Sequence, residues 1–300
     1  MQADSKLIKK FIRLIEAKTG ATLIIYDDYR ILTGSGEFAD MSGLKRWHLN
    51  PYCIQMKERG MHRWCVGLKE QYNKKVAVCA GVCSSTCFCG VTEIAVPVIV
   101  EGKMLLTVAA AGLYGPLRTK MKESLSRKTG VSAADLEELR TQALMRITDT
   151  QKEELALYLE TVSCLLREYI LRRKNYDRDF SEMLEADVQN GYVQKALGYI
   201  NEHFMEQLDV ETIAAVCNLN SSYLQHLFSA RLGHGIGEEI RMCRIHYACA
   251  LLEASDRPIK NIALSSGFYN VDYFCTVFKR SMGISPLKYR KAHCNSYNDK

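Results

Sequence analysis

Four cysteines lie within twelve residues of one short segment, CAGVCSSTCFCG, at positions 79–90. Thiols at this density could bind zinc, copper(I) or an iron–sulfur cluster, or they could be oxidised reversibly. The spacing differs from the paired C-x-x-C pattern of common structural zinc sites, so the segment does not identify its own chemistry. A free cysteine is also often a small buried apolar side chain. These three alternatives, metal, redox and packing, stay open at this point.

Other residues of the first half could share a site with this segment. A redox function needs a neighbouring base, such as His62 or Lys74, that lowers the pKa of one thiol. A zinc or other thiophilic metal site could combine His48 or His62 with thiols from a larger set: Cys53, Cys65, Cys79, Cys83, Cys87 and Cys89.

The composition is that of a globular chain with room for two domains. The 300 residues are 47% hydrophobic and 25% charged, with a net charge of +6. The apolar runs at 94–100 and 104–113 are too short to cross a bilayer, and residues 5–18 predict an amphipathic helix instead of a secretory leader. We expect a cytoplasmic protein.

The scattered placement of the twelve cysteines favours free thiols over a disulfide framework. Those in helix-patterned segments are expected to be buried: Cys164, Cys217, Cys243 and Cys249. The sequence has no P-loop, Rossmann glycine set, G-x-S-x-G or H-E-x-x-H motif. We therefore expect no enzymatic activity.

The C-terminal third contains an internal repeat. The segments TIAAVCNLNSSYLQHLFSARLG, from Thr212, and NIALSSGFYNVDYFCTVFKRSMG, from Asn261, align at an offset of 49 and then 50 residues. Each copy predicts a helix, a tight turn and a second helix. Asn218 and Gly267 fit a turn position with positive φ. Asn220 and Asn270 stand where an N-cap side chain is needed, so two helix-turn-helix units are expected, at about 209–231 and 259–281.

The second helix of each copy has an apolar stripe and an outward face. The predicted buried stripes are Tyr223, Leu224, Leu227 and Phe228, and Tyr273, Phe274, Val277 and Phe278. Outward polar and small side chains can meet base edges in a DNA major groove. The candidate base-reading residues are Ser222, Gln225, His226, Val271, Asp272, Cys275 and Thr276.

Basic residues gather at the end of the chain, where residues 257–291 hold seven basic side chains and a single acidic one. Such a segment suits the phosphates of a nucleic acid. The candidate phosphate contacts are Arg231, Lys279, Arg280 and Arg290.

The segment from Asp149 to Asp179 has no proline or glycine and predicts a long helix. Its apolar seam alternates steps of four and three residues: Leu155, Leu159, Val162, Leu166 and Tyr169. This seam favours a two-stranded coiled coil in a homodimer, with docking onto the chain's own first domain as the alternative.

The first part of the chain mixes helical and strand patterns. Strands are expected at Thr22–Tyr26 and Tyr29–Leu32, helical pieces at 50–60 and 61–75, and a hairpin that turns at Glu101 and Gly102. The pattern is typical of small α+β sensor folds of the PAS and GAF kind.

The segment GFYNVDYFCTVFKRSMGISPLKYR resembles the signature of AraC/XylS-type transcription regulators, and residues 192–291 are similar to that DNA-binding module over its whole length. The resemblance implies seven helices, with two recognition helices entering successive major-groove segments about one DNA turn apart. It also implies promoter DNA and RNA polymerase as partners, and activation of a catabolic operon.

The segments NPYCIQMK, CVGLKEQ and CFCGVTEIAVPVIVEGKMLL resemble the PocR sensory domain. The resemblance implies a PAS-like pocket for small organic molecules such as diols. The candidate ligand-binding residues are His48, Tyr52, Cys53, Cys65 and Cys87.

Together these features predict an α+β chain with a sensor domain at 1–148, a helical connector or dimerisation segment at 149–188 and an all-α DNA-binding domain at 189–300. The predicted function is a one-component transcription regulator controlled by a small organic ligand. The alternative is a metal- or redox-responsive regulator that uses the N-terminal cysteines.

Overall fold

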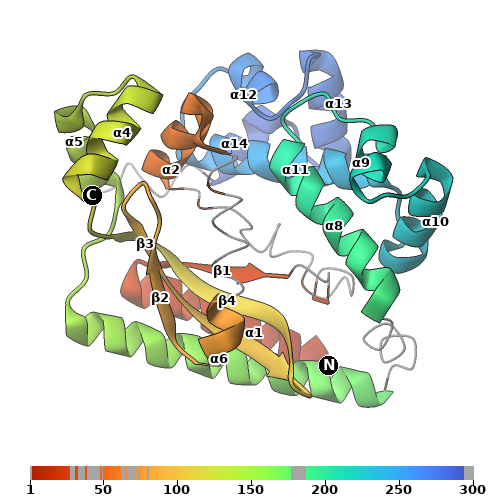
Figure 1. Cartoon of the computed structure of the whole chain (residues 1–300), viewed down its shortest axis with the longest axis horizontal. Helices are drawn as coiled ribbons and strands as arrows, with labels where there is room; N and C mark the ends of the chain where they lie inside the picture. Colours follow the sequence, from red (N-terminus) through yellow and green to blue (C-terminus); the bar gives the residue numbers. More distant parts are fainter. Residues whose placement is uncertain are drawn as a thin grey trace. The chain divides into compact units, whose positions relative to one another are not determined.

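The computed structural model describes residues 2–27, 31–32, 38, 48, 50–62, 65, 72, 75–79, 81–176 and 187–293. The chain forms two compact units, Met1–Ala186 and Asp187–Lys300, which are drawn in Figure 1. The predicted connector is therefore part of the first unit up to Tyr176, where its helix ends. Among the described residues, no helix is both long and apolar enough to span a membrane.

The first unit is built on a four-stranded antiparallel sheet in the order β1-β4-β3-β2. The strands are β1 (Thr22–Tyr26), β2 (Cys83–Thr86), β3 (Val91–Val100) and β4 (Lys103–Tyr114). The expected hairpin is present, since Val100 pairs with Lys103 and the turn residues Glu101 and Gly102 have φ values of 49° and 79°. Two consecutive positive φ values match the twist of the flanking strands.

One predicted strand is wrong. Within the expected strand Tyr29–Leu32, the described residues Ile31 and Leu32 lie in a turn. The backbone amides of both residues donate to the buried carboxylate of Asp27, at 2.7 and 2.9 Å, which favours a turn over a ladder. The helical piece predicted at 50–60 is confirmed as α2 (Pro51–Met56) and the π-helical turn η3 (Lys57–Met61). Most of the piece predicted at 61–75 lies outside the described residues.

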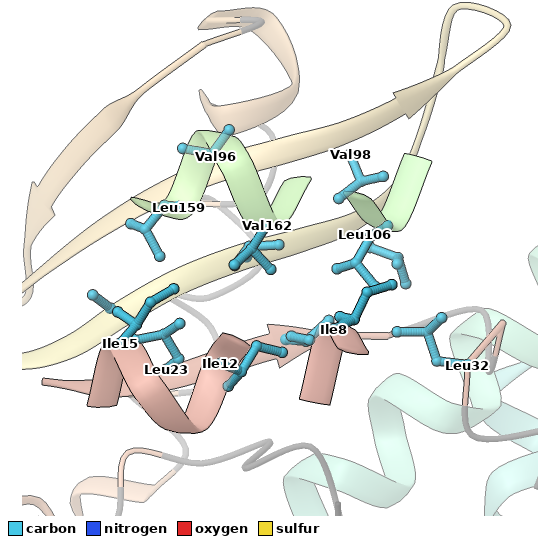
Figure 2. Packing of buried hydrophobic residues seen from close by; sticks show 14 of the residues in the cluster. Ile8, Ile12, Ile15, Leu23, Leu32, Val96, Val98, Leu106, Leu159 and Val162 are labelled. Carbon is cyan, nitrogen blue, oxygen red and sulfur yellow. The ribbon is translucent and has the colours of Figure 1, made fainter. Parts of the chain in front are cut away.

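Two helices, α1 (Gln2–Thr19) and α6 (Asp149–Tyr176), pack on one face of the sheet. Figure 2 shows Ile8, Ile12 and Ile15 of α1 beside Leu159 and Val162 of α6, with strand residues above and below. Every second residue of β3 contributes to this core, as the alternation of a pleated strand requires.

The apolar seam of α6 faces this sheet. Its five residues, Leu155, Leu159, Val162, Leu166 and Tyr169, are at most 2% exposed and belong to the core of their own protomer. The favoured interpretation, a coiled coil between subunits along this seam, is therefore wrong, and docking onto the chain's own sheet is confirmed. Cys164 is exposed on the opposite side of the helix, contrary to its expected burial.

A second layer surrounds the opposite end of the hairpin. The helices α4 (Thr119–Thr129) and α5 (Ala133–Ala143) cover a separate apolar cluster that includes Cys53 and Cys89. The guanidinium of Arg140, 1% exposed, donates to the carbonyls of Gly90 and Gly115 and ties the end of β4 to the turn before β3.

In the part of the second unit that the structure describes, there are seven helices, as the resemblance implied. They are α8 (Asp187–His203), α9 (Val210–Val216), α10 (Ser221–Leu232), α11 (Ile236–Ala254), α12 (Ile259–Ser265), α13 (Val271–Met282) and α14 (Pro286–His293). The long α11 lies between the α9–α10 pair and the α12–α13 pair and packs against members of both (Figure 1). It supplies much of the core, with Tyr247, Leu251 and Leu252 at most 1% exposed.

Candidate nucleic-acid interface and sensor site

The two predicted helix-turn-helix units are present, and their turns have the expected geometry. Asn218 and Gly267 have φ values of 57° and 83°, in the left-handed region that few residue types tolerate. Asn220 and Asn270 cap α10 and α13, and in each case the side-chain oxygen accepts from the backbone amide three residues later at 2.8 Å. The repeated sequence thus produces a repeated backbone.

The glycine in the second turn meets a further constraint. A Cβ atom on Gly267 would lie 2.8 Å from the carbonyl oxygen of Phe204 and 3.0 Å from Nε of Arg244. Arg244 is fixed there because its Nε donates to that same carbonyl at 2.7 Å and its guanidinium lies over the Phe268 ring. Asn218 is therefore tolerated in the first turn, whereas the second turn has no room for a side chain.

The buried stripes of α10 and α13 are narrower than predicted. Leu224, Leu227 and Phe228, and in the repeat Phe274, Val277 and Phe278, are buried as expected. Tyr223 and Tyr273, however, are 44% and 52% exposed, so the prediction that both tyrosines are buried is wrong. Each is the third residue of its helix, where the first turn projects beyond the core.

The predicted base-reading side chains lie on the outward side of both helices. Ser222, Gln225, His226, Asp272 and Thr276 are exposed, and Val271 and Cys275 are half-buried. The Thr276 hydroxyl donates to the carbonyl of Asp272 at 2.9 Å. The methyl group of Thr276 is therefore the part of this side chain that is available for an outside contact. Burial raises the pKa of the Cys275 thiol, which keeps it neutral at ordinary pH.

The candidate phosphate contacts differ among themselves. Lys279 and Arg280, at the end of α13, are exposed, whereas Arg231 and Arg290 are half-buried. The guanidinium of Arg290 donates to the carbonyl of Arg257 and so joins α14 to the loop before α12. The structure thus leaves Lys279 and Arg280 as the more accessible cations of the four.

The first unit contains a buried ionic cluster that sequence reasoning missed. The side chain of Glu93, in the middle of β3, is 7% exposed, and its Oε2 lies 2.5 Å from Nε2 of His48. Tyr26 of β1 donates to the same oxygen at 3.0 Å. The signal in the sequence was a single carboxylate within VTEIAVPVIV, an otherwise apolar strand.

His48 is held in its charged form by this cluster. Burial by itself lowers the pKa of His48, but hydrogen bonds with Cys53 and Glu93 outweigh burial and raise that pKa to about 10. Its backbone carbonyl accepts from Nζ of Lys57 at 3.0 Å. Among the described residues, Oε1 of Glu93 is buried without a hydrogen-bond partner, so one strong acceptor in this cluster is unsatisfied.

The predicted sensor thiols are only partly brought together. Cys53, Cys87 and Cys89 belong to one apolar cluster, whereas Cys83 belongs to another, beside Val76 and Ala95. The Cys53 sulfur accepts from the Asn50 amide at 3.2 Å. Tyr52 is fully buried, and its hydroxyl donates to the Cys89 carbonyl at 3.0 Å, which gives this predicted ligand residue a packing role.

Cys87 and Cys89 differ sharply in their chemistry. The Cys87 sulfur is half-buried and interacts with the Cys89 thiol, whose hydrogen bond lowers the pKa of Cys87 to about 6. Cys89 is 3% exposed, and its pKa is raised because its proton is shared with Cys87 and because it is buried. Burial raises the pKa of Cys65 to about 12, so it is protonated at neutral pH.

The metal-binding alternative is not supported by this arrangement. Within the part of the chain that the structure describes, no group of three or more His, Cys, Asp or Glu side chains could hold a metal ion. Of the two bases proposed for a redox function, His62 is buried and Lys74 lies outside the described residues.

Two capped helix-turn-helix units joined by one long helix define a tandem helix-turn-helix DNA-binding protein. Residues 213–292 match a family model described as a helix-turn-helix domain. The chain is 31% identical over 98 residues to the regulatory protein SoxS of Salmonella typhimurium, across 33% of this chain and 92% of SoxS. It belongs to the AraC/XylS family of helix-turn-helix transcription regulators.

Two further relatives differ in how much of the chain they match. The regulatory protein PocR of Salmonella typhimurium is 23% identical over 305 residues, across 96% of this chain and 94% of PocR. YijO of Escherichia coli, an HTH-type transcriptional regulator, is 28% identical over 124 residues, and the match covers 40% of this chain and less than half of YijO, 44%. The similarity to PocR therefore includes the first unit.

Among solved structures, the C-terminal domain of AraT, a response regulator from Geobacillus stearothermophilus, is 32% identical. The match covers 36% of this chain and 91% of that domain, with a TM-score of 0.35.

Proposed function

We propose that this AraC/XylS-family regulator reads promoter DNA with the outward faces of α10 and α13 and responds to a small organic effector bound in its first unit. The observation that carries the first part is the matched exposure of Ser222, Gln225 and His226 on α10 and of Asp272 and Thr276 on α13. Both faces are free of the protein core and start from identical caps. Binding to promoter DNA would place the protein in the cytoplasm.

The residue types on the two faces suit different bases. Gln225 can bond an adenine in two places, and Asp272 can accept from a cytosine amine. Val271, Cys275 and the Thr276 methyl suit a thymine methyl group. The two units therefore read different half-sites, and the operator is not a simple repeat.

Phosphate contacts complete this interface. Lys279 and Arg280 are exposed about one helical turn after Thr276, the last base-reading residue of α13. This position suits contacts between their cationic groups and the DNA phosphates at the edge of the groove. Arg231 and Arg290 are assigned a weaker part because both are half-buried.

The ionic cluster at Glu93 supports an effector site on the sheet. Oε1 of Glu93 needs a hydrogen-bond donor, and the charged His48 already neutralises the carboxylate. An uncharged donor, such as the hydroxyl of a small alcohol or diol, suits this acceptor better than a second cation. Nearby alanines, Ala95 and Ala109, leave the same side of the sheet lined by small side chains.

Effector control requires that the ligand bind two conformations with different affinities, because equal affinities shift no equilibrium. The resemblance of the chain to catabolic activators implies that the bound form activates transcription with RNA polymerase. A promoter reporter with and without effector tests the sign of this control.

The central experiment is DNA footprinting of the full chain on the promoter region of its own operon. We expect two adjacent protected major-groove segments on one face of the duplex. Protection of a single segment would show that one unit does not bind. A thermal-shift screen of small diols, alcohols and amines tests the effector site, with Glu93→Gln as the isosteric variant that should lose the shift.

A second candidate function, a redox-responsive regulator, is favoured by the Cys87–Cys89 pair. The Cys89 thiol lowers the pKa of the half-buried Cys87 thiol, which favours the reactive thiolate form, and it supplies a second thiol beside it. Footprinting with a thiol oxidant and then with a reductant tests this function. Loss of the oxidant response in Cys87→Ser, with the diol response retained, would separate the two candidates.

A further inference from the structure

A histidine follows the reading helix of the first helix-turn-helix unit. Gly233 caps the end of α10, and Nε2 of the next residue, His234, lies 2.9 Å from Oε2 of Glu239 on α11. The side chain of Glu239 is fully buried, and His234 is half-buried. The other ring nitrogen of His234, Nδ1, lies 2.9 Å from the backbone carbonyl oxygen of Leu232, the last residue of α10. The imidazole ring therefore joins the end of α10 to the first turn of α11.

Both nitrogens of this ring face an oxygen that accepts hydrogen bonds. The Leu232 carbonyl can only accept, so Nδ1 must carry a proton. A neutral imidazole would then have no proton on Nε2, and its lone pair would point at an oxygen of the Glu239 carboxylate. The two contacts together therefore need one more proton than a neutral histidine and a carboxylate possess. The pair holds this proton either on the imidazolium or on the carboxyl group.

The same pair is connected to a third helix. Sγ of Cys243, one turn further along α11, lies 3.7 Å from Oε1 of Glu239 and 3.6 Å from Oδ1 of Asn201 on α8. On the other side, the ring of Phe228 in α10 meets the ring of His234 edge-on, with 6.3 Å between the ring centroids. The proton shared by His234 and Glu239 thus fixes the end of α10 within the core formed by α8 and α11.

Other titratable or charged side chains lie on the same three helices: Lys195, His203, His226, Arg231, Glu238, Arg241 and His246. Glu238 is paired with Arg241 on α11. His226 is exposed on the DNA-reading side of α10. Because histidine is the side chain that ordinarily changes charge near neutral pH, a test of His234 must keep His226 unchanged.

The second helix-turn-helix unit repeats the backbone at this place. Gly233 and Gly283 cap the ends of α10 and α13 with φ values of 74° and 76°. Each glycine amide donates to the carbonyl four residues earlier at 2.9 Å. The two amides are therefore matched probes of the two helix ends.

The side chains that follow the two glycines differ. At the offset of 50 residues, Ile284 corresponds to His234, and Tyr289 corresponds to Glu239. Tyr289 is buried, and its hydroxyl donates to Glu253 at 2.7 Å. Burial raises the pKa of Tyr289, so this tyrosine keeps its proton at neutral pH. The first unit, in contrast, ends its reading helix on a contact that depends on an extra proton.

We propose that His234 is a positioning residue for the DNA-reading face of α10 and that it acts only while it shares a proton with Glu239. When this proton is lost, Nε2 and Oε2 repel each other, and the end of α10 is released from α11. The stabilisation is present at low pH and is lost as the pH rises through the range in which the pair releases its proton. DNA binding by the first unit then weakens, a consequence that rests on the proposed function of α10.

The first test needs no DNA. Hydrogen exchange of the full chain is measured between about pH 5 and pH 9, a range that includes the titration of histidine. The protection of the Gly233 amide is divided by that of the Gly283 amide, which removes the common effect of pH on the chemical exchange rate. We expect this ratio to fall about tenfold at the upper end, as for the loss of one hydrogen bond to a charged group.

Two variants separate His234 from other titrating groups, and both keep His226. Glu239→Gln should give a ratio that does not change with pH, because the introduced amide can donate to Nε2 of a neutral His234. His234→Ile combined with Glu239→Tyr copies the second unit and should also remove the pH dependence. The double variant serves if the glutamine weakens the fold, which circular dichroism reports.

Two results of the exchange experiment would overturn the proposal. One is a ratio that stays constant over the whole pH range in the natural chain. The other is a fall that persists in Glu239→Gln and in the double variant, which would assign the effect to a different group.

The second test adds DNA. Footprinting of the full chain should show one major-groove segment losing protection at high pH while the adjacent segment stays protected, and Glu239→Gln should protect both throughout. Equal weakening of both segments, in the natural chain and in Glu239→Gln alike, would contradict the link between His234 and DNA reading. Protection of neither segment at any pH would instead contradict the proposed DNA-reading function and would leave the exchange result standing.

Discussion

The two helix-turn-helix units have the same backbone but different surroundings. Their turns share a residue with positive φ and an asparagine cap, yet the first has Asn218 where the second has Gly267. Arg244 packs against the second turn, and its guanidinium donates to the carbonyl oxygens of Phe204 and Glu206 at 2.7 and 2.9 Å. The duplicated geometry is thus retained while each copy adapts to its own neighbours.

The C-terminal ends of the two second helices, α10 and α13, differ in charge. Lys279 and Arg280 of α13 correspond, at the offset of 50 residues, to Ser229 and Ala230 of α10. The second unit therefore offers two exposed cations to the DNA backbone where the first offers none at the same positions. From this comparison we expect the first unit to depend mainly on base contacts and the second to gain affinity from phosphate contacts as well.

The largest expected effect comes from exchanging the turn residues. Gly267→Asn keeps a residue that tolerates positive φ but adds a Cβ 2.8 Å from the Phe204 carbonyl, so we expect a loss of about 2–3 kcal/mol of stability. Asn218→Gly should change stability by less than about 1 kcal/mol. Hydrogen exchange of the amides in α9, α10, α12 and α13 of the full chain measures both. Equal costs at the two turns would contradict the asymmetry.

The base-reading faces should differ in what their mutation does. Gln225→Ala is expected to relax preference at one base pair by about 1–3 kcal/mol, because a bidentate contact is lost. Thr276→Ser retains the hydroxyl that bonds to Asp272 and removes only the methyl, so it should weaken preference for thymine by a smaller amount. Competitive binding to a library of operator variants measures both changes. Unaltered preference in Gln225→Ala would mean that α10 does not read bases.

The helix caps should behave alike. Asn220→Ala and Asn270→Ala each remove one acceptor from the first turn of α10 or α13, at the same distance of 2.8 Å, and should each cost about 1 kcal/mol. Urea unfolding of the full chain provides the measurement, with replacement of either asparagine by aspartate as the control that keeps the cap. A large difference between the two alanine variants would show that tertiary contacts, not the caps, determine the helix starts.

The smallest effect concerns salt. Arg280→Ala should weaken binding to all sequences alike and reduce the slope of log affinity against log salt by about 1, as expected for one phosphate contact. Ala230→Arg should add a contact to the first unit and steepen that slope by a similar amount. Filter binding at salt concentrations between about 50 and 200 mM, where phosphate contacts strongly change the affinity, gives the slope for each variant. A change of sequence preference in Arg280→Ala would reassign that residue to base reading.

Sequence reasoning succeeded where local geometry repeats. The positive φ at Asn218 and Gly267 and the caps at Asn220 and Asn270 depend on residues within one turn of each other, so two aligned copies were enough to predict them. The hairpin at Glu101 and Gly102 belongs to the same class. The predicted buried stripes each include one residue too many, because periodicity shows which face of a helix is apolar but not where the core ends. Tyr223 and Tyr273 lie beyond the edge of the core.

Prediction from the sequence failed where an apolar or charged side chain could pack against more than one part of the chain. The seam of α6 was correctly recognised as apolar, but a heptad-like spacing fits a sheet as well as a second helix, and the sheet covers it. Glu93 was passed over because its meaning depends on His48 and Tyr26, which lie 45 and 67 residues away in the chain. No pattern within one element indicates such a pairing.

The sequence alone determined the helix-turn-helix repeat, its caps and turns and the family to which the chain belongs, because these depend on short-range backbone preferences and on residue types at fixed spacing. Only the tertiary structure decided that the α6 seam is internal, that Gly267 has no room for a side chain and that, among the described residues, Oε1 of Glu93 is buried without a hydrogen-bond partner. Each of those facts is a contact between distant segments, and contact is a property of the folded chain in space.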